Sequence, residues 1–139
     1  LSTGMCTEEQ IASAIDILDN VEIVLACTST YPTVPSEVNL KHIYSLKNKN
    51  PNLTIGFSNH YNGLDACVGA VALGAMCIEF HITNDRAAYG SDQSASIENA
   101  DELVDAVRKM ELMLGDGVKK VYESEKPIAK KLRKVSNTC

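Results

Sequence analysis

The sequence predicts an α/β fold with parallel strands, and three observations carry this prediction. Strand-like and helix-like segments alternate along the chain, their connections are short, and the segment at 21–29 is an almost continuous apolar run, as expected of a strand buried on both faces. A strand–helix–strand order requires a crossover and places successive strands parallel. The chain holds four such β-then-α units. They fit either a small doubly wound sheet or half of an eight-fold barrel, and periodicity alone does not separate the two.

The strand segments are short and apolar. They are the strand end LSTGM at 1–5, VEIVLACTS at 21–29, LTIGFSNH at 53–60 and MCIEFHIT at 76–83. We expect the last three to be parallel neighbours in chain order, with the helices on one face of the sheet.

A helical pattern follows each strand. The first helix lies within 7–20, where Thr7 and Gln10 have the spacing of a capping box. The second lies within 36–50, with Ser36 as its expected N-cap, and ends before Pro51. A third, built from small residues, lies within 63–74, and an amphipathic fourth covers 99–115, where Gly115 is expected to end it.

Composition points to one globular domain. The chain has 139 residues, of which 45% are hydrophobic, enough for one domain with a core. No apolar stretch reaches the length of a membrane span, and the N-terminus lacks the pattern of an export signal. The five cysteines form no C-x-x-C pair and mostly lie in apolar runs. We therefore expect a cytoplasmic protein with no membrane partner.

Charge divides the chain into two segments. Residues 1–118 contain 6 Lys or Arg and 16 Asp or Glu. Residues 119–139 contain 7 Lys or Arg and 2 Asp or Glu. We interpret 119–139 as a basic linker, because such runs are usually solvated helix ends or linkers. We do not expect nucleic acid as a partner, for two reasons. Residues 1–118 are acidic, and Tyr122 is the only aromatic residue among the basic residues of the linker.

Two of the three histidines stand at the ends of successive strands. Side-chain alternation puts His60 on the same face as Ser58, and His81 on the same polar face as Glu79. Active sites of parallel α/β folds lie at the C-terminal strand ends, and neighbouring strands are about 5 Å apart. The two imidazoles could therefore share one divalent metal, although a histidine bonded to a loop is the commoner outcome. His42, within the second helix, is expected to face solvent.

Six motifs, in order and spacing, resemble the C-terminal half of the catalytic barrel of the sialic acid synthase family. They are STGM, CTSTYPTVPSEVNL, PNLTIGFSNH, VALGAMCIEFHIT, GSDQSAS and LGDGVKKVYESEKP. These enzymes condense phosphoenolpyruvate with N-acetylmannosamine or a related sugar aldehyde and release phosphate. The resemblance implies that residues 1–118 form a parallel (β/α)4 half of a TIM-type (β/α)8 barrel.

The resemblance also implies roles for individual residues. His60 and His81 match the family's ligands to a catalytic Mn²⁺ or Mg²⁺, and two imidazoles leave about four positions of an octahedral ion for water and substrate oxygens. The remaining matches concern the substrates: phosphoenolpyruvate would contact Ser2, Ser29 and Ser58, and the sugar acceptor would contact Tyr31 and Asp92.

The chain departs from the family pattern near the sugar position. Phe80 replaces a frequent lysine, but alternation turns it toward the helices, so we expect only a packing change. Gln93 replaces a histidine, and Asn59 and Tyr61 flank the first metal histidine in place of small or acidic residues. The sequence therefore leaves three kinds of sugar acceptor: N-acetylmannosamine, its 6-phosphate, and precursors of legionaminic or pseudaminic acid.

Family members also carry four preceding β/α units and a C-terminal antifreeze-like domain, and they are expected to be homodimers. We therefore expect this chain to be part of a longer enzyme and to be inactive alone, since Arg86 is its only Lys or Arg between 50 and 106. Arg86 is the best local candidate for binding phosphoenolpyruvate, although an ion pair with Asp85 or Asp92 is its more common role. The alternatives are a non-catalytic half-barrel interaction module or a related phosphoenolpyruvate-dependent sugar-acid synthase.

Overall fold

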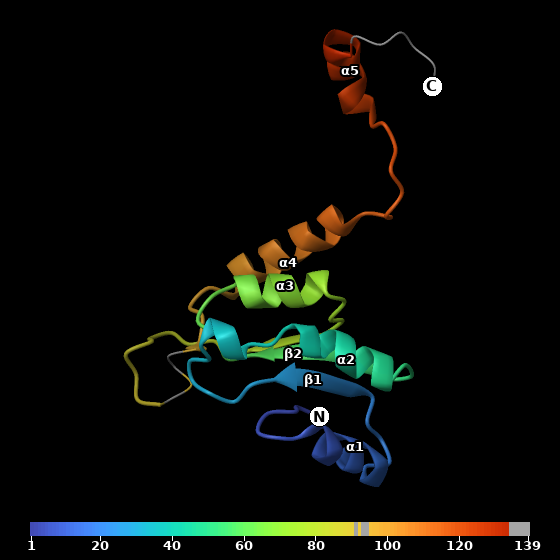
Figure 1. The fold of residues 1–139 in the computed structure, drawn as a ribbon. Helices are drawn as coiled ribbons and strands as arrows, with labels where there is room; N and C mark the ends of the chain where they lie inside the picture. The colour runs from blue at the N-terminus through green and yellow to red at the C-terminus, as the bar shows by residue number, and fades with distance from the viewer. Residues whose placement is uncertain (91, 93–94, 134–139) are drawn as a thin grey trace.

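A parallel three-stranded sheet forms the centre of the protein (Figure 1). The structure is a computed structural model that describes residues 1–90, 92 and 95–133. The strands, in sheet order, are β1 (Ile23–Cys27), β2 (Thr54–Asn59) and β3 (Ile78–Phe80). Both pairs are parallel, so the predicted α/β class and the pairing in chain order are confirmed.

Two short bridges extend the sheet beyond its named strands. Ser2 pairs in parallel with Leu25, so the predicted strand end at 1–5 lies beside β1. On the other side, Ile82 pairs in parallel with Ile97. Four successive strand-like segments therefore run side by side in chain order.

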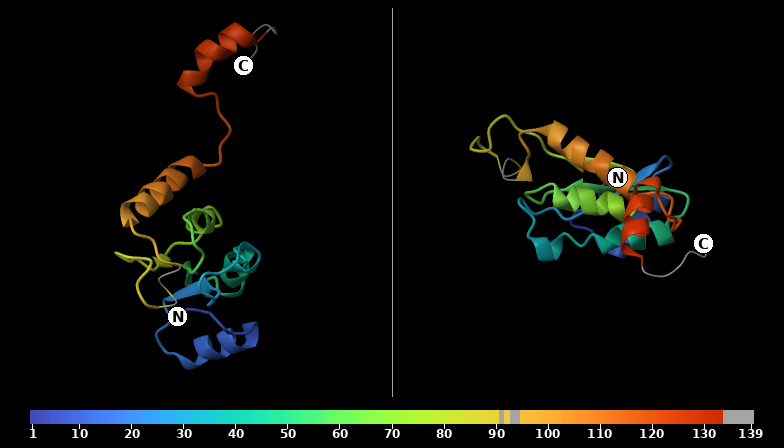
Figure 2. Two further views of the ribbon diagram at one scale, coloured as in Figure 1. Left: turned by 90° about the vertical axis from the view of Figure 1, so that its left-hand side faces the viewer. Right: turned by 90° about the horizontal axis from the view of Figure 1, so that it is seen from above.

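Four helices share one core with the sheet, and a fifth stands apart from it. They are α1 (Glu8–Ile17), α2 (Lys41–Lys49), α3 (Asp65–Ala72), α4 (Ala100–Leu114) and α5 (Lys126–Leu132). Two 3₁₀ turns, η1 (Pro35–Glu37) and η3 (Glu123–Glu125), precede α2 and α5. Figure 2 shows α5 standing away from the sheet, at the end of an extended segment. None of the helices in the described part of the chain combines the length and apolarity needed to cross a bilayer.

The expected helix ends are largely present. Thr7 and Gln10 form both hydrogen bonds of the predicted capping box at the start of α1. The Asn99 side chain accepts from the backbone N–H of Asp101 and so caps α4. Gly115 ends α4 with a φ of 60°, a left-handed value that glycine adopts without steric cost.

The predicted N-cap Ser36 is wrong. Ser36 lies inside η1, and α2 begins only at Lys41, with Leu40 as an N-cap that makes no side-chain bond. Asn39 separates the two elements because its φ of 48° is incompatible with a right-handed helix. The Ser36 pattern therefore marks a turn and not the start of the helix.

One core joins the sheet to the helices. Val24 and Ile43 are fully buried, and Leu103 of α4 is 2% exposed in the same cluster. The small residues of α3 let it pack close to β2, and α4 lies alongside α3 (Figure 1). Phe80 packs against this core, so its predicted orientation toward the helices is confirmed. All four helices α1–α4 contribute residues to the core, as a one-face arrangement requires.

The opposite face of the sheet is more open. Ile23 is 38% exposed and Thr54 is exposed, although both belong to strands. Gly56 is the close-packed point of this face, since a Cβ there would lie 2.5 Å from both the Cys77 carbonyl oxygen and Leu25 Cδ2. The strands thus approach one another where β2 has no side chain.

We predict that Gly56→Ala destabilises the protein by about 1–3 kcal/mol, because the new methyl group must displace a backbone carbonyl. Urea unfolding followed by circular dichroism measures the change. Thr54→Ala is the matched control, because it alters an exposed position on the same face of β2 and is expected to change stability by less than about 0.5 kcal/mol. Equal stability of the two variants would contradict this packing.

Candidate functional site

The parallel register aligns side chains from three strands in rows across the open face. Cys27 of β1 pairs with Ser58 of β2, and Ser58 pairs with Glu79 of β3. Two residues further along each strand direction come Ser29, His60 and His81. The predicted site residues on β1, β2 and β3 therefore meet at one edge of the sheet, where the strands end.

His60 is held in one orientation. It is 5% exposed, and its Nδ1 lies 2.8 Å from the Thr28 carbonyl oxygen. Because a carbonyl oxygen only accepts, Nδ1 carries the proton and Nε2 presents a lone pair. The Tyr31 hydroxyl lies 3.0 Å from Nε2 and donates to it.

His81 completes a cluster of three rings. Its centroid lies 5.2 Å from that of His60, and the Tyr31 ring lies 4.2 Å from His60 and 5.7 Å from His81. His81 Nδ1 faces Asp92, whose Oδ2 is 3.5 Å away. Four of the predicted site residues, from two strand ends and two loops, thus lie together.

Ser58 is linked to a residue that was not predicted to belong to the site. Its hydroxyl donates to Glu79 Oε2 at 2.5 Å, across the β2–β3 pair. Glu79 shares the polar face of the last strand with His81, and this alternation was the signal that could have identified it. A carboxylate therefore lies on the open face, one row before the two histidines.

Ser29 and Ser2 occupy different levels of the face. Ser29 lies in the row of the histidines, with its Oγ 3.6 Å from Cys27 Sγ. A Cβ on Gly4 would fall 1.9 Å from this hydroxyl, so a side chain at position 4 would displace the Ser29 hydroxyl from its place. Ser2 is exposed and pairs with Leu25, two rows before Ser29. The structure brings Ser29 and Ser58 close to the histidines and leaves Ser2 further along the face.

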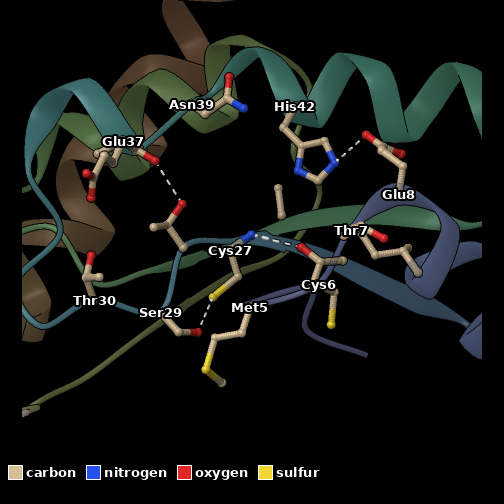
Figure 3. A pocket seen from close by; sticks show the side chains of 15 residues that line it. Met5, Cys6, Thr7, Glu8, Cys27, Ser29, Thr30, Glu37, Asn39 and His42 are labelled. Atoms are coloured by element: carbon tan, nitrogen blue, oxygen red, sulfur yellow. Dashed lines mark hydrogen bonds and ion pairs between the residues drawn. The ribbon is translucent and has the colours of Figure 1, made fainter.

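A cavity of about 580 Å³ opens beside Ser29, between α1, α2 and the end of β1. Figure 3 shows Cys27 and Ser29 facing it from the strand end, and Glu8 and His42 from the helices. The prediction that His42 faces solvent is wrong: its side chain is 19% exposed, and its Nε2 lies 3.2 Å from Glu8 Oε1. His42 joins α2 to α1 and lies apart from the ring cluster.

Arg86 does not form the predicted ion pair. Within residues 1–90, 92 and 95–133, neither Asp85 nor Asp92 pairs with it, and its Nη1 donates instead to Asn62 Oδ1 at 2.8 Å. This bond ties the segment after β3 to the segment after β2. Gln93, the other departure near the sugar position, lies outside the described residues.

His60 and His81 are the candidate metal ligands that the described residues bring together. Among the residues that the structure describes, no group of three or more His, Cys, Asp or Glu side chains could hold a metal ion. The tautomer of His60 suits a ligand, because the Nδ1 bond to Thr28 orients the ring and frees Nε2. The described cysteines, Cys6, Cys27, Cys67 and Cys77, are free thiols.

Comparison with known proteins identifies the family. The NeuB family model matches residues 1–119. The chain belongs to the NeuB family. It is 40% identical over 133 residues to human N-acetylneuraminate-9-phosphate synthase, covering 94% of this chain and 37% of that protein. It is 45% identical over 124 residues to pseudaminic acid synthase from Campylobacter jejuni, and this match covers 84% of this chain and 36% of that protein.

A solved structure of the same kind matches the fold. N-acetylneuraminic acid synthetase from Leptospira borgpetersenii, in complex with citrate, superimposes with a TM-score of 0.79 at 33% identity. The match covers 97% of this NeuB-family chain and 50% of the other. The chain therefore spans well under half the length of the two curated relatives, and half of the solved chain.

We predict that Tyr31 ionises above its ordinary range. Burial, followed by the charges of Cys27, Asp92 and Glu79, raises the pKa of the Tyr31 phenol above 10. The folded state therefore keeps a proton that the unfolded state loses, and this contribution to stability falls as pH rises above 10. Absorbance at 295 nm, wild type minus Tyr31→Phe, should show one phenol with a midpoint above pH 10. A midpoint at or below 10 would contradict the arrangement.

Proposed function

We propose that this NeuB-family chain is part of an enzyme that condenses phosphoenolpyruvate with N-acetylmannosamine or a related sugar aldehyde, forming a sialic or other nonulosonic acid and releasing phosphate. The observation that carries the proposal is the cluster of His60, His81 and Tyr31 at the C-terminal strand ends. The human and Campylobacter relatives are named as synthases of this class. We propose a cytoplasmic, homodimeric parent enzyme.

The architecture proposed for the parent is a TIM-type (β/α)8 barrel, of which residues 1–118 would be the C-terminal (β/α)4 half. Four strand-like segments in chain order, with the helices on one face, support this assignment. The open opposite face would then line the barrel interior. Residues 119–139 would be the basic linker toward an antifreeze-like domain.

We propose that His60 and His81 hold a catalytic Mn²⁺ or Mg²⁺. The orientation of His60, with its Nδ1 bonded to Thr28 and Nε2 turned toward the cluster, fits a ligand to such an ion. When bound, the ion would stabilise the negative charge that develops on the aldehyde oxygen. Tyr31 currently donates to His60 Nε2, so its hydroxyl would have to move to a substrate oxygen.

The other side chains would bind and orient the substrates. Carbon 3 of phosphoenolpyruvate attacks the sugar aldehyde, water adds to carbon 2, and phosphate leaves with cleavage of its C–O bond. Ser29 and Ser58, with Ser2 further along the face, would donate hydrogen bonds to phosphoenolpyruvate. Ser58 has one hydroxyl proton, which it now donates to Glu79, so this proton would have to turn from Glu79 to phosphoenolpyruvate. Tyr31 and Asp92 would hold the acceptor next to the histidines.

The binding of phosphoenolpyruvate needs positive charge that this segment does not supply. Residues 1–118 carry a net charge of −10, and Arg86 is the single Lys or Arg in residues 51–105. Glu79 and Asp92 stand beside the histidines and would repel a substrate with close to three negative charges. The cations that hold it are therefore proposed to come from other parts of the parent enzyme.

We predict that the chain binds Mn²⁺ and that His81→Ala weakens this binding at least about 10-fold, because one of two protein ligands is lost. Isothermal titration calorimetry of the 139-residue chain measures the dissociation constants. His42→Ala is the matched control, since this histidine pairs with Glu8 outside the cluster and its loss should leave the affinity unchanged. Equal Mn²⁺ affinity of wild type and His81→Ala would remove the proposed site.

We predict that the isolated chain releases no phosphate from phosphoenolpyruvate and N-acetylmannosamine, because it lacks the cations that bind the first substrate. Adding the polypeptide that precedes this region in family relatives should restore Mn²⁺-dependent phosphate release. His81→Ala in the restored assembly is the control and should be inactive. Robust synthesis by the chain alone would overturn the half-barrel proposal, and inactivity of the restored assembly would count against the synthase function.

A further inference from the structure

Thr33 is a buried residue that bonds both to His60 and to the carbonyl group that orients the His60 ring. It is 4% exposed, although it lies in the loop between β1 and α2. Its backbone N–H donates to the His60 carbonyl oxygen at 2.8 Å. Its hydroxyl lies 3.2 Å from the Thr28 carbonyl oxygen, which is the same oxygen that accepts from His60 Nδ1. Thr33 therefore meets both the backbone of His60 and the group that orients its ring.

The Thr33 hydroxyl also fixes the shape of the loop that carries Tyr31. It lies 2.9 Å from the Thr30 carbonyl oxygen and accepts from the Thr30 hydroxyl at 3.3 Å. Its single proton is thus shared between the carbonyls of Thr28 and Thr30, on one side of a tight turn. Tyr31 is the next residue in this turn, and its hydroxyl reaches His60 Nε2.

The hydroxyl of Thr33 makes hydrogen bonds that the packing of its side chain does not require. Valine has nearly the same shape as threonine, so filling this space does not by itself require a hydroxyl. Each polar atom of the Thr33 side chain and amide has a partner, and those partners converge on the Thr28–Tyr31 turn and on His60. The two nitrogens of the His60 ring are in turn contacted by the two ends of this turn.

We propose that Thr33 is a positioning residue of the site: through the carbonyl of Thr28 and the turn that bears Tyr31, it holds the His60 ring in the Nδ1–H tautomer with Nε2 directed at the cluster. Thr33 itself touches no substrate. Its effect on metal binding rests on the proposed function, whereas its effect on the tautomer of His60 does not.

The test compares Thr33→Val, which keeps the volume and removes the hydroxyl, with Thr33→Ser, which keeps the hydroxyl. Two-bond ¹H–¹⁵N correlation spectra of the metal-free 139-residue chain, at a pH where histidine is neutral, report which His60 nitrogen carries the proton. Wild type and Thr33→Ser should show the Nδ1–H tautomer alone. Thr33→Val should show a mixture with the Nε2–H form. A pure Nδ1–H signal in Thr33→Val would overturn the proposal.

Mn²⁺ titration of the same proteins gives a second, independent readout. Thr33→Val should bind Mn²⁺ about 10-fold more weakly than wild type, as expected when a group that orients a ligand is lost, and Thr33→Ser should recover the affinity. If wild type itself binds no Mn²⁺, the proposed metal site fails while the tautomer comparison still decides the role of Thr33. If Thr33→Val does not fold, Thr33→Ala removes the hydroxyl without adding a buried methyl group and replaces it in both measurements.

Discussion

In-register parallel pairing of β1, β2 and β3 is the constraint on which the rest of the structure depends. The pairing of Cys27 with Ser58 and of Ser58 with Glu79 brings side chains that are more than twenty residues apart into one row. A shift by one residue in either pair would turn a whole strand over, burying its polar side chains among the helices. The apolar side chains on the other face, such as Val24 and Phe57, fix this register because they fill the core against α2 and α3. The candidate site is thus a consequence of core packing on the opposite face.

Much of the fold could be predicted from local patterns, because those patterns are strong. Alternation placed Phe80 toward the helices, the Thr7–Gln10 spacing gave a capping box, and Gly115 ended α4. The start of α2 could not be predicted, since it depends on a left-handed residue at Asn39 that a Ser36 capping pattern does not reveal. His42 looked exposed because the helical pattern alone does not show that α1 brings Glu8 to it.

The candidate site was predictable in its strands and not in its loops. Strand alternation predicts that His60 and His81 share a face, and family resemblance added Tyr31 and Asp92. The sequence did not predict that the Thr28 carbonyl oxygen accepts hydrogen bonds from both His60 and Thr33. These bonds depend on the shape of a turn, and the sequence pattern does not show that shape. Arg86 illustrates the same limit: two acidic neighbours in sequence suggested an ion pair, whereas its partner is Asn62 on a different loop. Contacts between loops follow from the strand ends that bring the loops together.

We propose that His60 and His81 bind one metal ion, and that the Thr28 turn orients the His60 ring before the ion binds. Electron spin echo envelope modulation of the Mn²⁺-loaded chain tests it directly, because this method counts the imidazole nitrogens bound to the ion. Two histidine nitrogens should contribute modulation in wild type, and one should contribute in His81→Ala. Absence of histidine modulation in wild type, or an unchanged pattern in His81→Ala, would contradict it.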